Sequence, residues 1–374
     1  MNIVFFDDLE QDIVSINFVI PIGTKTIYKG KKNNFAHLIE HLLFHGHPEL
    51  TQYELMLQIE QMGGLVNAGT NGYYTELFAR VHKKFVIETI DLLSKAIKCF
   101  SIRKEEYEME KNVVAIEEKM KLTNENAVLD IVLDEFFEKF PKSPIPSFNN
   151  ITKLYKEIYD NWTIIIIGKL CENEKKMISS IFTADINSNV DPLNNVLMKD
   201  LRYNRLCVHK KHNNQNMFFY VHNCNSTTTD IIAMKLIKYI YTNGLASVLY
   251  NKFVAEEGYC YSINFNNFLI NNKFFVISFI YDCAPFEKMK EYIEKVFAIE
   301  FIDNMADKQY EMAKNMAITE AILKRERVSA ILNDRVENYI FQQDITMTEE
   351  KINTLLNMST ENTRKLVKES LKPY

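Results

Sequence analysis

The residues best suited to chemistry lie close together in the motif His37-Leu38-Ile39-Glu40-His41. On a helix, positions i and i+4 lie one above the other and position i+3 projects beside them, so both imidazoles and the carboxylate share one side. Two neutral imidazoles at this spacing form a ligand pair for Zn²⁺, and an adjacent carboxylate can accept a proton from metal-bound water. H-x-x-E-H is the inverted form of the metallopeptidase signature H-E-x-x-H, and it predicts a zinc-dependent hydrolase.

The sequence around the motif predicts that it forms a short helix. Residues 12–20 alternate between apolar and polar types and are rich in β-branched residues, which indicates a strand before the motif. Asn33 or Asn34 is placed to cap a helix over residues 36–44, and the Gly-His-Pro sequence at 46–48 ends it. Both histidines therefore lie on one uninterrupted helix.

The next elements supply the rest of the predicted site. A helix over residues 51–62 ends at a Gly-Gly pair, which we expect to serve turn geometry, and residues 65–81 alternate as a strand does. Helical patterns follow at 84–97 and 104–121, a further helix is expected near 127–140, and the apolar run 163–168 predicts a buried strand.

Three blocks resemble the pitrilysin-like (insulinase) peptidases, family M16. The sequence N-F-A-H-L-I-E-H-L-L-F-H-G is similar to that family's G-x-A-H-x-x-E-H-x-x-F-x-G. The block from Gly63 to Thr70, with Thr75 after it, resembles the family's G-G-x-x-N-A-x-T, and the segment from Glu110 to Glu117 resembles E-R-x-x-V-x-x-E. The blocks stand in the family's order and at its spacing, which makes a chance match a poor explanation.

The resemblance implies a role for each matching residue. His37, His41 and Glu117 would hold one Zn²⁺ per chain and leave a fourth position for water, and Glu40 would be the general base. Glu110 would orient a ligand histidine. Residues 65–78 would form an edge strand that pairs with an extended substrate, with contacts from Asn67 and Ala68.

Two choices within the predicted site stay open on spacing alone. The helix over 104–121 carries six glutamates, and Glu118 is the alternative to Glu117 although the two are rotated by about 100°. His45 follows His41 by four residues and could crowd the same face. In the family that position is not a ligand, and the helix dipole favours a histidine in a last turn.

The second half repeats the order of the first half loosely. Strands are expected near 205–208, 217–221, 261–265 and 274–281, and helices at 229–241, 246–254, 286–297 and 308–324, but the histidine motif has no counterpart there. We therefore predict a zinc-bearing domain over residues 1–190 and a domain without the metal motif over 191–374. The expected fold class is α+β, with two homologous domains of mostly antiparallel sheet flanked by helices, and the resemblance implies half of a clamshell.

One departure from the family concerns its R-E-x-x-G-L-x-Y segment, whose Arg and Tyr reach the substrate. Here the matching stretch keeps Tyr261, a predicted catalytic residue, but has Val254 in place of the Arg. The resemblance implies that the chain pairs with a second M16-like chain, either a metal-free relative that supplies the missing Arg in a heterodimer or another copy in a homodimer.

Composition excludes several other classes of protein. The net charge of −5 and the mixing of lysines with glutamates argue against a nucleic-acid binder. The sequence has no apolar run long enough for a membrane span and no secretory start, and its six cysteines show no metal or disulfide spacing. We therefore expect a cytoplasmic protein.

The predicted function is zinc-dependent hydrolysis of short or unstructured peptides. Removal of the leader from a ribosomally made peptide is one such task, and general peptide turnover is another. The alternatives are a non-catalytic subunit of the same fold that binds peptides or scaffolds a complex, and an unrelated hydrolase with a metal-binding helix. Zinc stoichiometry distinguishes the first alternative from the enzyme.

Overall fold

The computed structural model shows an α+β chain that divides into two compact units, which confirms the predicted fold class. Unit 1 comprises Met1–Met120, Phe140–Leu197 and Arg335–Gln342, and unit 2 comprises Lys121–Lys139, Met198–Asp334 and Gln343–Tyr374. The structure describes residues 2–7, 12–29, 31–121, 125–136, 143–182, 202–212, 214–225, 229–269, 273–342 and 346–372. The predicted domain boundary after residue 190 lies outside the described residues.

A mixed sheet forms the centre of unit 1. Its strands are β1 (Asn2–Phe6), β2 (Ile13–Ile20), β5 (Leu65–Thr70), β6 (Thr75–His82) and β7 (Thr163–Ile167). They lie in the order β1-β7-β2-β6-β5, with β1 and β7 parallel and the other neighbours antiparallel. All five residues of β7 are buried, as the apolar run predicted for a central strand.

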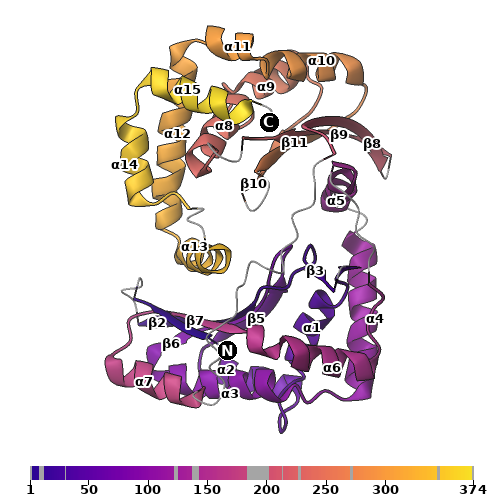
Figure 1. The fold of residues 1–374 in the computed structure, drawn as a ribbon, viewed down its shortest axis with the longest axis vertical. Coiled ribbons are helices and arrows are strands. Elements are labelled where there is room, and N and C mark those ends of the chain that lie inside the picture. Colours follow the sequence, from indigo (N-terminus) through magenta and orange to yellow (C-terminus); the bar gives the residue numbers. More distant parts are fainter. Residues whose placement is uncertain are drawn as a thin grey trace. The chain divides into compact units, whose positions relative to one another are not determined.

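Helices cover the apolar face of this sheet, toward which Leu77 and Ala79 of β6 point. They are α1 (Ala36–Leu43), α2 (Gln52–Gln61), α3 (Val86–Cys99), α4 (Lys104–Lys121), α6 (Phe148–Ile158) and α7 (Glu172–Ile181) (Figure 1). Strand alternation turns Glu76, Phe78 and Arg80 to the opposite face. That face is therefore the more polar one.

The prediction of one edge strand over residues 65–78 is wrong, because this segment folds into a hairpin. The chain turns back after β5, and β6 pairs antiparallel with it from Thr70 opposite Thr75 to Leu65 opposite Arg80. In the loop between the strands, Asn71 Oδ1 accepts hydrogen bonds from the backbone N–H groups of Tyr73 and Tyr74, at 2.7 and 2.9 Å. Of these two strands, β5 lies at the edge of the described sheet, and β6 lies between β5 and β2.

Unit 2 repeats this plan around a four-stranded antiparallel sheet. Its strands are β8 (Arg205–His212), β9 (Gln215–Asn223), β10 (Asn264–Phe268) and β11 (Phe274–Tyr281), in the order β10-β11-β9-β8. Its helices are α5 (Glu125–Phe136), α8 (Ile231–Tyr241), α9 (Val248–Tyr250) with a π-helical turn (Asn251–Glu256), α10 (Phe286–Val296), α11 (Ile299–Asn304), α12 (Asp307–Arg325), α14 (Glu349–Asn357) and α15 (Thr360–Leu371). None of the described helices is long and apolar enough to cross a membrane.

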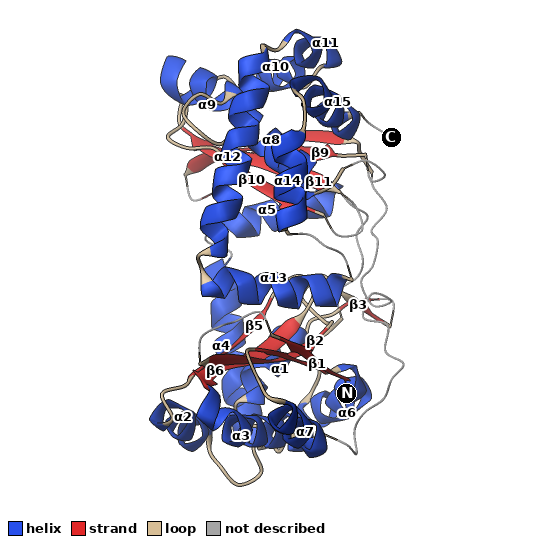
Figure 2. Ribbon diagram, turned by 90° about the vertical axis from the view of Figure 1, so that its left-hand side faces the viewer, coloured by secondary structure: helices blue, strands red, loops and turns tan. Residues whose placement is uncertain are grey.

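Each unit also receives one helical segment from the other half of the sequence. In unit 2, Val132 and Phe136 of α5 pack on the face of the sheet that carries Phe219. In unit 1, the C-terminal part of α13 (Val328–Phe341) lies over the polar side of the sheet (Figure 2), where Asn2 Nδ2 donates to the Tyr339 hydroxyl at 2.7 Å. No helix was predicted over this segment.

Candidate metal centre

The histidine motif lies on α1, whose boundaries follow from local chemistry. The backbone N–H of Ala36, the first residue of the helix, donates to Asn33 Oδ1 at 3.2 Å. Asn33 therefore supplies an acceptor for a backbone N–H group that has no partner within the helix. The helix is followed by Gly46, where an added Cβ would lie 2.3 Å from the carbonyl oxygen of Ala96. One face of α1 is anchored in the core by Leu38, Ile39, Leu42 and Leu43.

The two predicted histidine ligands come together with Glu117 of α4. The imidazole rings of His37 and His41 lie 5.0 Å apart. Nε2 of His37 is 3.2 Å from Glu117 Oε2, and Nε2 of His41 is 3.7 Å from Glu117 Oε1. One potential ligand atom from each residue lies within 4.8 Å of the other two. Ligands about 2.1 Å from zinc at the tetrahedral angle are about 3.4 Å apart, so this donor set fits zinc.

Helix α4 presents Glu117 on the same side as its buried residues, seven positions after Glu110. Tyr107, Glu110 and Val114 are buried at spacings of three and four residues, which sets the rotation of the helix. Glu117 is 39% exposed and turns toward α1, whereas Glu118 is exposed and does not belong to the cluster. Among the described residues, this is the only group of three or more potential ligands close enough to share one ion.

Glu110 lies directly behind the cluster. It is 7% exposed, and its Oε2 is 2.9 Å from His41 Nδ1. We infer that His41 Nδ1 carries the proton and donates it to the carboxylate, because this leaves the Nε2 lone pair facing Glu117 and the ion site.

The second oxygen of Glu110 has a partner that was not predicted from the sequence. His45, in the turn after α1, is buried and places Nε2 2.8 Å from Glu110 Oε1. Its Nδ1 is 3.7 Å from Glu106 Oε1, and Arg103 Nε donates to the same oxygen at 2.9 Å. Burial opposes ionisation of Glu106, but hydrogen bonds from Arg103 bring the pKa of that carboxyl below its usual value. The helical spacing of His41 and His45 was the available signal.

Glu40 and Glu76 are two further carboxyl groups whose charges interact. Glu40 lies half-buried on α1, between the two histidines of the motif. The pKa of Glu76 on β6 is raised to about 7, mainly by burial and also by the negative charges of Glu337 and Glu40, while Arg80 opposes the rise. Glu76 was not predicted as a site residue, although the strand alternation places it on the polar face.

The predicted substrate-binding residues lie on the edge strand β5. Asn67 is exposed, and its Oδ1 accepts a hydrogen bond from the backbone N–H of Ala68 at 2.9 Å. Ala68 is half-buried and packs against the core of unit 1. Because β5 pairs with β6 on one side and is the last strand of the described sheet, its other side is the one on which an extended peptide could add.

The predicted catalytic tyrosine belongs to the other unit. Tyr261 precedes β10 in unit 2, and the residue is 93% exposed. Val254, which stands where the related family has an arginine, packs against the core of unit 2. A role for Tyr261 in catalysis stays a prediction.

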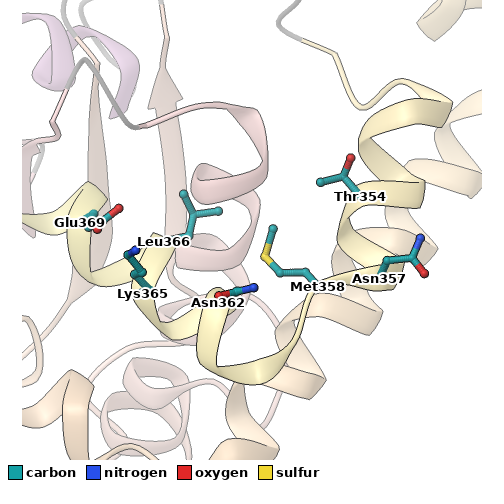
Figure 3. A pocket seen from close by; sticks show the side chains of 7 residues that line it. All are labelled: Thr354, Asn357, Met358, Asn362, Lys365, Leu366 and Glu369. Atoms are coloured by element: carbon teal, nitrogen blue, oxygen red, sulfur yellow. The ribbon is translucent and has the colours of Figure 1, made fainter.

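A cavity of about 480 Å³ lies in unit 2, away in sequence from the metal cluster. Figure 3 shows the side chains of α14, α15 and their connection around it. They are Thr354, Asn357, Met358, Asn362, Lys365, Leu366 and Glu369. This lining has one carboxylate and no histidine or cysteine, so it offers no comparable metal site.

Comparison with protein families agrees with this geometry. Residues 3–144 match the family described as Insulinase (Peptidase family M16), and residues 128–317 match the one described as Peptidase M16 inactive domain. The first match contains all the residues of the metal cluster. The second covers much of the half of the chain that lacks the histidine motif.

Known relatives match only part of the chain. The mitochondrial-processing peptidase subunit beta of Caenorhabditis elegans is 30% identical over 146 residues, which cover 37% of this chain and 31% of that protein. The human protein of the same name is 32% identical over 119 residues, which cover 32% of this chain and 24% of that protein. The zinc protease PqqE of Helicobacter pylori is 22% identical over 163 residues, which cover 42% of this chain and 34% of that protein. The chain therefore matches about a third or less of these relatives' length.

Solved structures extend the likeness of fold to the whole chain. A protease from Helicobacter pylori superposes with a TM-score of 0.81 at 16% identity, covering 99% of this chain and 94% of that one. The periplasmic protease PqqL from Escherichia coli superposes with a TM-score of 0.75 at 14% identity, covering 98% of this chain and 42% of that one. At these identities the superpositions show a shared fold.

Proposed function

The chain belongs to peptidase family M16, and on that premise we propose that it is a zinc-dependent endopeptidase that hydrolyses short or unstructured peptides. The observation that carries the proposal is the convergence of His37, His41 and Glu117 at separations that suit tetrahedral zinc. Three protein ligands would leave the fourth position open, as in catalytic zinc sites.

Each residue of the site has a distinct task in this proposal. When bound, zinc lowers the pKa of a coordinated water to about 7 and polarises the scissile carbonyl. Glu40 takes a proton from the attacking water and delivers it to the leaving amine. Glu110 holds the His41 imidazole through the 2.9 Å contact to Nδ1.

The edge strand β5 supports the choice of peptide as substrate. An extended peptide that adds to β5 would be held mainly by backbone hydrogen bonds, which tolerate many side chains. Asn67 and Ala68 are the proposed contacts on that strand. A folded protein cannot present such a segment without local unfolding, so unstructured peptides are the favoured class.

A second M16-like chain is part of the proposal. The family's arginine is replaced here by Val254, whose side chain packs into its own unit and cannot substitute for a guanidinium. Two of the relatives are named as the beta subunit of a processing peptidase, a name that places them in an assembly. We favour a metal-free relative that supplies the arginine over a second copy of this chain.

The physiological role is the least constrained part of the proposal. Leader removal from a ribosomally made peptide suits a small peptidase that recognises extended backbone, and general peptide turnover is the other task. All six cysteines are free, which supports a reducing compartment such as the cytoplasm.

Cleavage of an unstructured peptide library tests the proposal. Glu40→Gln keeps the shape of the side chain and removes the base, so we expect cleavage to fall by a factor of about 10² to 10⁴ with the zinc content unchanged. Glu49→Gln, which changes an exposed carboxylate nearby, should cleave as the wild type does. Wild-type cleavage by Glu40→Gln contradicts its role as base. Zinc without cleavage, even when a partner chain is added, favours a peptide-binding subunit.

A further inference from the structure

A chain of polar contacts leads from the metal cluster to the start of α4. His41 Nδ1 contacts Glu110 Oε2 at 2.9 Å, and Glu110 Oε1 contacts His45 Nε2 at 2.8 Å. His45 Nδ1 faces Glu106 at 3.7 Å, and Glu106 is held in turn by Arg103. Glu110 thus lies between two imidazoles, only one of which belongs to the metal cluster.

The contact from His45 determines how the Glu110 carboxylate is oriented. The terminal torsion of a glutamate is broad and roughly two-fold, so a single hydrogen bond leaves the carboxylate plane free to turn. Glu110 has one imidazole on each oxygen, which fixes that torsion. Both residues are buried, Glu110 at 7% and His45 at 7% exposure, and a buried carboxylate needs such donors.

We propose that His45 is a positioning residue of the metal centre, acting through Glu110. By donating from Nε2 to Glu110 Oε1, it holds the carboxylate where the other oxygen accepts from His41 Nδ1, and it thereby fixes the direction of His41 Nε2. His45 itself is not among the residues that converge on the ion site. This inference rests on the proposed zinc site. It adds His45, in the turn after α1, as a residue that holds the site's geometry without binding the ion.

Glu106 lies beside His45, and Arg103 holds Glu106. With Glu106 on its Nδ1 side and Glu110 on its Nε2 side, the imidazole has a carboxylate at each nitrogen. Arg103 hydrogen-bonds Glu106 through both its backbone N–H, at 2.7 Å, and its Nε, at 2.9 Å. The start of α4 therefore places a carboxylate held by Arg103 next to the turn that carries His45.

Zinc affinity, measured by competition with a chromophoric chelator, tests the proposal. Removing a hydrogen-bond partner of a zinc ligand costs about 10- to 100-fold in affinity, and His45 acts one contact further away, so His45→Leu should weaken zinc binding by roughly 10-fold. In His45→Gln the amide nitrogen lies near the position of Nε2 and can still donate, so affinity should stay within about threefold of wild type. His45→Asn carries the same group on a shorter side chain that does not reach Glu110, and it should behave like His45→Leu.

His47→Leu is the matched control. His47 is equally buried two residues away, but its Nδ1 accepts from the backbone N–H groups of Glu49 and Leu50 and it does not contact Glu110. Fluorescence of Trp162, buried in unit 1, shows that each variant is folded. If His45→Leu does not fold, the zinc affinities of His45→Gln and His45→Asn are compared instead, and their difference tests the positioning role.

The outcomes separate this inference from the proposed function. Zinc in the wild type with weakened binding in His45→Leu and His45→Asn, and near-normal binding in His45→Gln and His47→Leu, supports the positioning role. Equal affinities for Gln and Asn at this position, or equal losses for His45→Leu and His47→Leu, overturn it and leave the peptidase intact. A wild-type protein that binds no zinc overturns both.

Discussion

Glu76 is the carboxyl whose titration should be visible in the stability of unit 1. It lies half-buried on β6, and burial raises its pKa from 4.5 to about 7. Arg80 on the same strand lowers the pKa, while Glu337 of α13 and Glu40 of α1 raise it. Between pH 4.5 and 7 the folded protein therefore holds a proton that the unfolded chain has lost.

The size and the sign of the change in stability with pH follow from the difference between the folded and unfolded pKa of Glu76. One pKa unit corresponds to about 1.4 kcal/mol, so the whole difference corresponds to roughly 3 kcal/mol, and partial exposure reduces the expected value to about 1–3 kcal/mol. Because the folded pKa is raised, this contribution to stability is fully present below pH 4.5 and is lost as the pH rises through 7. In Glu76→Gln the loss should disappear.

The single tryptophan makes the measurement specific to unit 1. Trp162 is fully buried there, so its fluorescence during denaturant unfolding follows this unit. The wild type should lose about 1–3 kcal/mol more stability than Glu76→Gln between pH 4.5 and pH 8. Glu60→Gln, an exposed position on α2, serves as the control and should follow the wild type. The same pH dependence in Glu76→Gln and wild type refutes the reasoning.

Three further predictions concern the metal and the local fold. Glu110→Gln removes the charge that orients a ligand imidazole, and zinc affinity in a chelator competition should fall by about 10- to 100-fold. Gly64→Ala brings a Cβ to 2.7 Å from Ile59 Cγ2 and 2.8 Å from Val81 Cγ1, so tryptophan fluorescence in denaturant should show unit 1 destabilised by about 1–3 kcal/mol. Gly69→Ala, where a Cβ meets nothing within 4 Å, is its control. Treatment with a zinc chelator should abolish peptide cleavage, and added zinc should restore it.

Local sequence rules were sufficient to predict α1 and the ligand pair it carries. The helical spacing of His37 and His41 and the breakers after the motif are short-range features, and the structure places both histidines on one helix. Glu117 is a long-range partner that spacing alone could not distinguish from Glu118. The resemblance favoured it, and the rotation of α4 set by its buried face is what brings it to the histidines.

The remaining errors have two sources, a local signal that was obscured and contacts that are distant in sequence. The hairpin between β5 and β6 carried a local signal in Asn71-Gly72, a dipeptide typical of tight turns, which the alternation over residues 65–81 obscured. The parallel pairing of β1 with β7 and the contribution of α13 to unit 1 join segments far apart in the chain, and no short pattern encodes them. The same holds for Glu76, whose environment depends on α1 and α13 together.

Zinc content by elemental analysis tests the central claim most directly, on the purified wild type and on the neighbouring variants Glu117→Gln and Glu118→Gln. The two changes have the same chemistry on adjacent positions of α4, but only Glu117 lies with the histidine pair. We predict about one zinc per chain in the wild type and in Glu118→Gln, and a strong loss in Glu117→Gln. A wild type without zinc, or loss in Glu118→Gln with retention in Glu117→Gln, would contradict the proposed metal centre.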